Sequence, residues 1–378
     1  MKPTTRYIIA RSLGNLYFWG SISVPYLVFR GFSISGAFTL LSFYSLLVVA
    51  LEFPTGVVGD LIGHKKTVIL ANLLGALNML LLSLKLPLAG YYFTFSIAAL
   101  AASLISGSDD AYLRSLSTDF RHDLAKVRKL GTVFAFISFT MAGFLAKINY
   151  TLPLIITAIA WIISNIILKP LPNDHIKQSG KGNIFRTAFT SLKYVKYNLP
   201  LIIVMFYGSL NEGFQLSIKT LINSATPALN IDIRYVGMII GFGVLNRTLA
   251  YQLAHKLEFI RTKYLFYVSL LLFASISIIN PGVISLILLA LSNFSVSLMT
   301  LRTDLTIHDL ISDPIRASVL SLKNLFVRLF SASYLFLSGF LINSNLLQLL
   351  MLITLIVYVI TGLLALKLNN MHRQTIDK

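Results

Sequence analysis

Apolar residues follow one another along this chain in stretches of about twenty, separated by short polar breaks almost from end to end. A helix that crosses a bilayer needs ~20 consecutive apolar residues. The pattern therefore predicts an all-α polytopic membrane protein with twelve spanning helices. We place them at residues 7–29, 36–58, 67–86, 91–113, 130–149, 152–168, 199–222, 235–255, 263–280, 281–302, 318–342 and 345–367.

The composition supports a membrane protein. Of the 378 residues, 56% are hydrophobic and only 12% are charged, whereas soluble domains carry about a quarter charged residues. The first apolar stretch follows Lys2 and Arg6 and runs past Trp19 without a small-residue cleavage site, so we expect it to be the first span and not a removed signal. The absence of cysteine excludes disulfides and thiolate metal sites.

The distribution of basic residues predicts the orientation. An even number of spans puts both termini on one side, and most of the 32 lysines and arginines fall in the loops of that side. The loops of the opposite side contain Arg30, Lys85, Lys147 and Arg234. By the positive-inside rule both termini are cytoplasmic, in an inner or plasma membrane. This topology accounts for most of the net charge of +18, so nucleic-acid binding is not needed to explain it.

The longest polar break, 169–198, divides the chain into two halves. We expect an N-terminal six-helix bundle at 1–168, a cytoplasmic linker at 169–198 and a C-terminal six-helix bundle at 199–378. Within the linker, Phe185, Ala188, Phe189 and Leu192 recur at helical spacing opposite basic residues. This spacing suits a helix lying on the membrane surface, and a solvated basic loop is an equally open interpretation.

The turn after the second predicted span carries a recognisable motif. The run GVVGDLIGHKK has Gly56, then Asp60 four residues later, then Gly63, and ends in Lys65 and Lys66. It resembles the loop signature of the major facilitator superfamily of transporters. The resemblance implies two pseudo-symmetric six-helix bundles around a midplane site, and a conformational latch formed by these five residues.

Other stretches resemble a drug-efflux-like branch of that superfamily. They are LEFPTG around Glu52, SGSDDAYL around Asp110, and IRASVLSLKNLF around Arg316. We add Asp110 to the latch, since Asp109, Asp110 and Arg114 are expected to form a charge network with Lys65 or Lys66. His64 stands where the family often has arginine, which predicts a weaker or pH-sensitive latch. The turn HKLEFIRTK has lost the acid-glycine pattern and the fifth span lacks a Gly-Pro signature, so antiport is not established.

Polar residues inside the spans are the candidates for function, because charges in a bilayer are costly. Glu212, Arg247 and Arg328 lie nearest the predicted bilayer centre. Polar residues on the first and seventh spans recur at helical spacing, and the resemblance implies that both helices line the cavity. The predicted substrate-binding residues are Asn15, Trp19, Tyr207, Asn211, Gln215, Arg247 and Arg328. Hydrogen bonding between helices would explain such stripes equally well.

These features predict a secondary active transporter working by alternating access on a small organic molecule. Glu212 is the candidate proton carrier, because burial makes a carboxylate harder to ionise and a nearby arginine makes it easier. In the C-terminal half four bases (Lys219, Arg247, Lys323, Arg328) oppose two acids (Glu212, Asp304), which favours an anionic or amphiphilic substrate. The resemblance favours efflux.

Two alternatives stay open. One is an uptake transporter, a uniporter or symporter, for a nutrient or an anionic metabolite, and the other is a non-transporting membrane scaffold. No zinc-protease motif, phosphate-binding glycine loop or nucleophile elbow is present. We therefore expect no enzymatic activity, no cofactor and no metal, and a monomer whose partners are the substrate, a proton or other coupling ion, and lipid.

Overall fold

The computed structural model describes residues 2–174, 198–257, 259–278, 282–310 and 313–343, with scattered residues between 349 and 363. The described residues form two compact units. The first takes its residues from Met1–Ser179 and Asn223–Leu245, and the second from Gly180–Ile222 and Asn246–Lys378. Two helices therefore contribute to both units, and the predicted domain boundaries at 168 and 198 stay a prediction.

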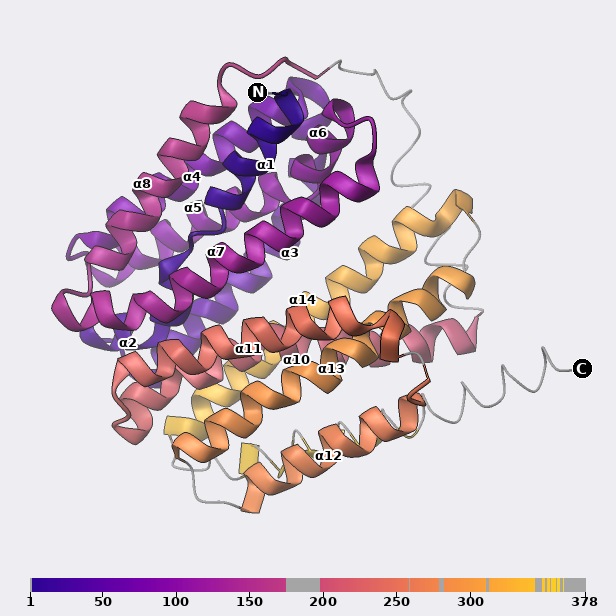
Figure 1. Cartoon of the computed structure of the whole chain (residues 1–378). Helices are drawn as coiled ribbons and strands as arrows, with labels where there is room; N and C mark the ends of the chain where they lie inside the picture. Colours follow the sequence, from indigo (N-terminus) through magenta and orange to yellow (C-terminus); the bar gives the residue numbers. More distant parts are fainter. Residues whose placement is uncertain are drawn as a thin grey trace, which may run out of the picture. The chain divides into compact units, whose positions relative to one another are not determined.

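The helices up to residue 168 all belong to the first unit. Figure 1 shows α1, α7 and α8 side by side, and α4 packs on both α5 and α8. In chain order the elements are α1 (Pro3–Leu13), the 3-10 helix η1 (Phe18–Ser21), α2 (Ser23–Phe29), α3 (Ile34–Ile62), α4 (His64–Ser83), α5 (Leu88–Ile105), α6 (Ser108–Leu116), α7 (Phe120–Ile148) and α8 (Leu152–Leu168).

The helices after the linker begin with α10 (Leu199–Leu229) and α11 (Ile233–Leu253), which are shared between the units. The elements that follow are η2 (His255–Leu257), α12 (Thr262–Ile278), α13 (Val283–Leu310) and α14 (Asp313–Asn343). In the second unit α12 lies along α13. The twelfth predicted span, 345–367, and the proposed linker helix fall largely or wholly outside the described residues.

The all-helical membrane fold is confirmed over the described part of the chain. Seven of its helices are long and apolar enough to cross a bilayer by themselves. Several extend beyond the predicted spans: α7 begins ten residues before position 130, and α13 ends at Leu310. A span predicted from hydropathy ends where the first charged residues occur. The helix itself continues into the polar region, because its backbone hydrogen bonds do not depend on apolar side chains.

The structure interrupts two of the predicted spans. The first span divides into α1, η1 and α2, and Pro25 lies in the first turn of α2, where its missing N–H costs no hydrogen bond. The fourth span divides into α5 and α6 at Ser106 and Gly107. Gly107 has φ of 79°, a left-handed conformation that favours glycine.

Close helix packing in the first unit depends on glycines. A Cβ atom at Gly75 of α4 would lie 2.3 Å from the ring of Trp161 on α8, so the indole occupies the space that a side chain would need. On α7, a Cβ at Gly143 would lie 2.4 Å from the carbonyl oxygen of Ile233 at the start of α11. Gly237 and Gly241, one turn apart on α11, also face α7: a Cβ there would lie 2.9 Å from the Phe139 carbonyl oxygen and 2.3 Å from Thr140 Oγ1, as in small-residue contacts between membrane helices.

We expect Gly143→Ala to destabilise the protein. The added methyl group meets backbone and not a flexible side chain, so α7 and α11 must separate, at a cost of about 1–3 kcal/mol. Thermal unfolding in detergent, followed by tryptophan fluorescence, measures the change. The matched control is Gly56→Ala on α3, where a Cβ has open space, so its midpoint stays at or above that of the wild type. Equal midpoints for the two variants would contradict the packing.

The start of α11 is organised by Asp232. Its carboxylate accepts a hydrogen bond from the Arg234 amide at 2.9 Å, as an N-cap, and pairs with the guanidinium of Arg234 at 2.9 Å and with Lys147 of α7 at 3.4 Å. The hydrogen bonds from Arg234 are the main cause that holds the pKa of the Asp232 carboxyl below its usual range, and Lys147 adds to them. Asp232 therefore favours the folded protein when it is ionised.

We expect Asp232→Asn to lower the unfolding midpoint by a few degrees at most at pH 7, since asparagine keeps the cap and loses only the exposed ion pairs. Because the folded pKa is the lower one, this contribution is complete well above the unfolded value of about 3.9 and is lost as the pH falls from there through the folded pKa. Unfolding curves of both proteins from pH 7 down to about pH 2 would show the difference hold to about pH 5 and shrink below about pH 4, and high salt would reduce it too. A difference that grew on acidification would contradict this assignment.

Candidate functional site

The break in the first span leaves backbone groups that need partners, because no water reaches them in a bilayer. One face of α8 supplies three polar side chains at spacings of four and three residues. Ser164 Oγ donates to the Ala10 carbonyl at 2.8 Å, Trp161 Nε1 donates to the Gly14 carbonyl at 2.9 Å, and Thr157 Oγ1 accepts from the Phe18 amide at 3.1 Å. These three contacts with α8 stabilise the interrupted backbone within the first unit.

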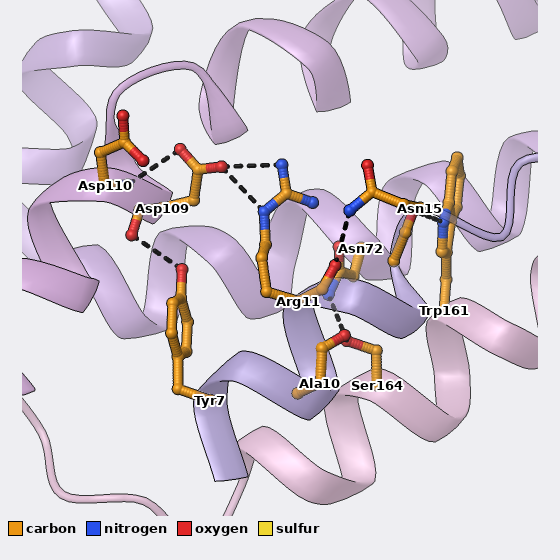
Figure 2. Close-up of polar contacts among 10 residues, drawn as sticks. Tyr7, Ala10, Arg11, Asn15, Asn72, Asp109, Asp110, Trp161 and Ser164 are labelled. Carbon is orange, nitrogen blue, oxygen red and sulfur yellow. Dashed lines mark hydrogen bonds and ion pairs between the residues drawn. The ribbon is translucent and has the colours of Figure 1, made fainter. Parts of the chain in front are cut away.

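An ion pair joins the two broken spans (Figure 2). Arg11, in the last turn of α1, directs Nε and a terminal nitrogen at Asp109 Oδ2, at 2.8 and 2.7 Å, and Asp109 lies in the first turn of α6. Each charge suits the dipole of the helix end that carries it. Tyr7 donates its hydroxyl hydrogen to the Asp109 carbonyl at 2.7 Å, and Asn15 Nδ2 donates to the Arg11 carbonyl at 3.0 Å.

This pairing differs from the expected network around Asp109 and Asp110. The observed partner of Asp109 is Arg11 and not Lys65 or Lys66. Asp110 is exposed, and its amide donates to Asp109 Oδ1 at 2.9 Å. The hydropathy pattern gave no reason to pair residues 98 positions apart, because the pairing depends on how α1 and α6 pack in three dimensions.

The motif turn between α3 and α4 holds the chain that follows α8. Gly63 has φ of 92°, and the next two amides, of His64 and Lys65, donate to the Asp174 carboxylate at 2.6 and 3.1 Å. The buried ammonium of Lys65 donates to the carbonyls of Lys169 and Leu171. The turn therefore anchors the first residues of the predicted linker.

The other predicted latch residues are not brought into this contact. Lys66 is exposed, a Cβ at Gly56 would meet open space, and the side chain of Asp60 lies outside the described residues. The latch formed by the predicted residues stays a prediction.

A buried ion cluster lies in the second unit. The Lys323 ammonium of α14 donates to Glu212 Oε2 of α10 at 2.7 Å and to Asp304 Oδ1 of α13 at 2.5 Å. The lysine side chain is 4% exposed, whereas both carboxylate side chains are 35% exposed. We call these three residues the carboxylate–lysine triad. It joins α10, α13 and α14, the helices that correspond to the seventh, tenth and eleventh predicted spans.

Two glycines of α10 let the three helices approach. A Cβ at Gly208 would lie 2.9 Å from the methyl group of Thr303 on α13 and 3.5 Å from Lys323 Cε. A Cβ at Gly213 would lie 2.6 Å from the ring of Phe330 on α14. Because Gly208 and Gly213 have no side chains, α13 and α14 can approach α10, and Lys323 can lie beside both acids.

Three predicted binding residues lie on α10, the helix that carries Glu212. Asn211 is 2% exposed, and its Nδ2 has no hydrogen-bond partner among the described residues. Gln215 Nε2 donates to Ser297 Oγ at 2.8 Å, and the buried Tyr207 hydroxyl contacts the sulfur of Met299 at 3.8 Å. These two contacts are hydrogen bonds between helices, which was the alternative interpretation of the stripe.

Two further predicted residues carry charge. Arg247 of α11 is exposed, and Arg328 of α14 is half-buried. Tyr251, one turn after Arg247, lies within electrostatic range of Arg247 and of all three triad residues. This face of α11 therefore lies toward the triad.

Trp19 belongs to the aromatic packing of the first unit. It is 4% exposed, with its ring centroid 5.3 Å from that of Tyr26 and 6.2 Å from that of Phe95, both edge-on. Sequence reasoning placed Trp19 on a cavity face because it assumed one continuous helix from residue 7 to residue 29. The break turns the residues beyond Asn15 to new directions.

The fold is similar to those of solved transporters. A crystal structure of the nucleoside transporter NupG matches with a TM-score of 0.75 and 17% identity, over 97% of this chain and 99% of that chain. A POT family transporter in complex with 5-aminolevulinic acid gives 0.73 and 14%, over 97% and 96%. A bacterial homologue of the iron transporter ferroportin, in an inward-facing state, gives 0.74 and 14%, over 97% and 98%.

These similarities confirm the predicted fold, a polytopic helical fold of the major facilitator type, over nearly the whole chain. No family model matches the sequence, and no curated protein matches it significantly. The neighbours are transporters and not enzymes, in agreement with the prediction.

We expect Arg11 and Asp109 to be energetically coupled. A double-mutant cycle with Arg11→Gln and Asp109→Asn, measured by unfolding in detergent, should give a coupling energy of about 0.5–3 kcal/mol, because both side chains are largely buried. The control cycle uses Lys126 and Asp123 of α7, whose lysine is 51% exposed, and should give less than about 0.5 kcal/mol. Additive effects of the two Arg11 and Asp109 substitutions would contradict the pairing.

Proposed function

We propose that this protein is a secondary active transporter that moves a small organic molecule across a membrane by alternating access. The observation that carries the proposal is the carboxylate–lysine triad, three ionisable groups held between spanning helices. Charges at such depth are expensive, and proteins retain them chiefly in substrate and ion pathways. The transporter fold and the break in the first span agree with this function.

Proton coupling through Glu212 is the second part of the proposal. Glu212 is partly exposed, so a proton can reach it, and it is paired with a base, so its protonation alters a buried ion pair. The partner that the structure supplies is Lys323, in place of the arginine considered from the sequence. Proton binding at this position would change the contacts between α10 and α14.

For the substrate we propose an anionic or amphiphilic organic molecule. Lys323 is occupied by the two acids, so the preference rests on the remaining bases of the second unit, Lys219, Arg247 and Arg328. Arg247 is exposed and lies within electrostatic range of Lys219, an arrangement that an anion would stabilise. The buried amide of Asn211 offers a further donor.

Direction and location complete the proposal. Efflux is favoured over uptake by the stretches around Glu52 and Asp110, which resemble the drug-efflux-like branch. The charge bias of the loops supports a cell or plasma membrane location, with both termini cytoplasmic. The protein would act as a monomer, since each chain would contain its own site.

Transport by purified protein in liposomes tests this function. Flux of a small panel of organic anions, amphiphiles and cationic dyes is followed with an imposed pH gradient of either sign. We expect accumulation against a gradient for an anion or amphiphile, and loss of the proton-driven part in Glu212→Gln. Glu212→Gln protein that still accumulates substrate up an imposed proton gradient would refute the role of Glu212.

The substrate preference has its own test. In the same vesicles Arg247→Ala and Arg328→Ala should each weaken anion transport about tenfold or more, as expected for the loss of one charged contact. Cationic dyes should not be affected. Unchanged apparent affinity for the anion in both variants would contradict an anionic substrate while leaving transport itself in place.

A further inference from the structure

The triad has an unusual ratio of partners, with two carboxylates for one buried lysine. Lys323 Nζ contacts Glu212 at 2.7 Å and Asp304 at 2.5 Å, and the ammonium is almost inaccessible while each acid keeps an open side. Ser209 Oγ donates to the Lys323 carbonyl at 3.3 Å and fixes α14 beside α10. A proton can therefore reach either acid without moving the lysine.

The energetic consequence follows from the cost of an unpaired buried charge. In a buried pair of one acid and one lysine, protonation of the acid leaves the buried ammonium without a counter-charge, which is strongly unfavourable. With a second carboxylate already in contact, Lys323 keeps one ionised partner whichever acid takes the proton. Asp304 thus removes most of the penalty for protonating Glu212, and Glu212 does the same for Asp304.

The other titratable groups near the triad cannot act as the second anionic partner of Lys323. Tyr251 of α11 lies within electrostatic range of all three groups, and Arg247 lies within range of Tyr251. Lys219 of α10 is two turns beyond Glu212 and lies within range of Arg247. These groups are basic or phenolic. Within the described part of the second unit, Glu212 and Asp304 are the carboxylates in contact with Lys323.

We infer that Asp304 and Glu212 together form one proton site, in which Lys323 stays with the ionised acid while the other acid carries the proton. This inference deepens the proposed function and rests on it for its physiological meaning. In the step itself one proton passes from water to a carboxylate oxygen, and one hydrogen-bonded ion pair to Lys323 is released. Asp304 is thereby assigned a role that the sequence did not give it.

The inference predicts opposite effects on proton binding for variants that remove one acid and for the variant that removes the lysine. In Asp304→Asn, and equally in Glu212→Gln, the lysine has one acid left, so that acid stays ionised and the site binds no proton in the working range. In Lys323→Gln the two carboxylates lose the cation that they share. Two like charges at close range hold a shared proton more firmly, so this variant keeps its proton at higher pH than the wild type.

Proton uptake by the purified protein in detergent measures these effects without a substrate. The pH is lowered from about 8 to about 5, and the protons bound per chain are counted with a soluble pH dye against a buffer blank. We expect Asp304→Asn and Glu212→Gln each to bind one proton fewer than the wild type. Lys323→Gln should take up its proton at a higher pH. The control is Asp232→Asn, whose surface carboxylate is already ionised throughout this range, and which should match the wild type.

The outcomes separate the inference from the proposed function. Asp304→Asn protein that binds as many protons as the wild type would overturn the shared site, as would a Lys323→Gln curve displaced to lower pH. A purely structural triad would lower the unfolding midpoint of all three variants without these opposite displacements. Liposomes without any flux would refute transport and leave the titration result standing, whereas flux in Asp304→Asn that keeps its pH dependence would refute the inference alone.

Discussion

The exclusion of water from the interior of a bilayer is the constraint on which this structure depends. Each backbone group and each charge within a span must find its partner in the protein, because an unsatisfied group there costs several kcal/mol. Regular helices meet this demand along most of the chain. Where the chain departs from a regular helix, other hydrogen bonds and ion pairs replace the missing helical contacts. These positions are the candidates for a role beyond crossing the membrane.

The break in the first span shows this compensation at the level of the backbone. Thr157 and Trp161 of α8 partner the Phe18 amide and the Gly14 carbonyl, which the missing helical turn leaves free. Ser164, on the same face, adds a second hydrogen bond to the Ala10 carbonyl, which also accepts the Gly14 amide. The ion pair of Arg11 with Asp109 then ties the broken first span to the broken fourth span. A non-helical segment at this depth is stable only inside such a frame, as in transporters that bind their substrates at discontinuous helices.

The triad of the second unit shows the same compensation for charge. The buried Lys323 ammonium contacts two carboxylates that are each partly exposed. Because one carboxylate can stay with the ammonium while the other is protonated, the free-energy cost of protonation is low. Glycines decide whether the arrangement can form, because Gly208 and Gly213 leave the space that brings α13 and α14 against α10. Packing and electrostatics thus act on the same few positions.

The sequence by itself determined that the chain lies in a bilayer, that it is all-helical and where most spans fall. The length of an apolar stretch and the charges beside it are local properties of the sequence, and they decide whether the segment inserts into a bilayer. It also singled out Glu212 as a charge at the depth where one is expensive. Only the tertiary structure decided the partners: Lys323 for both Glu212 and Asp304, Arg11 for Asp109, and Asp174 for the motif turn. These contacts join residues far apart in the chain and depend on breaks and glycine approaches that hydropathy does not record.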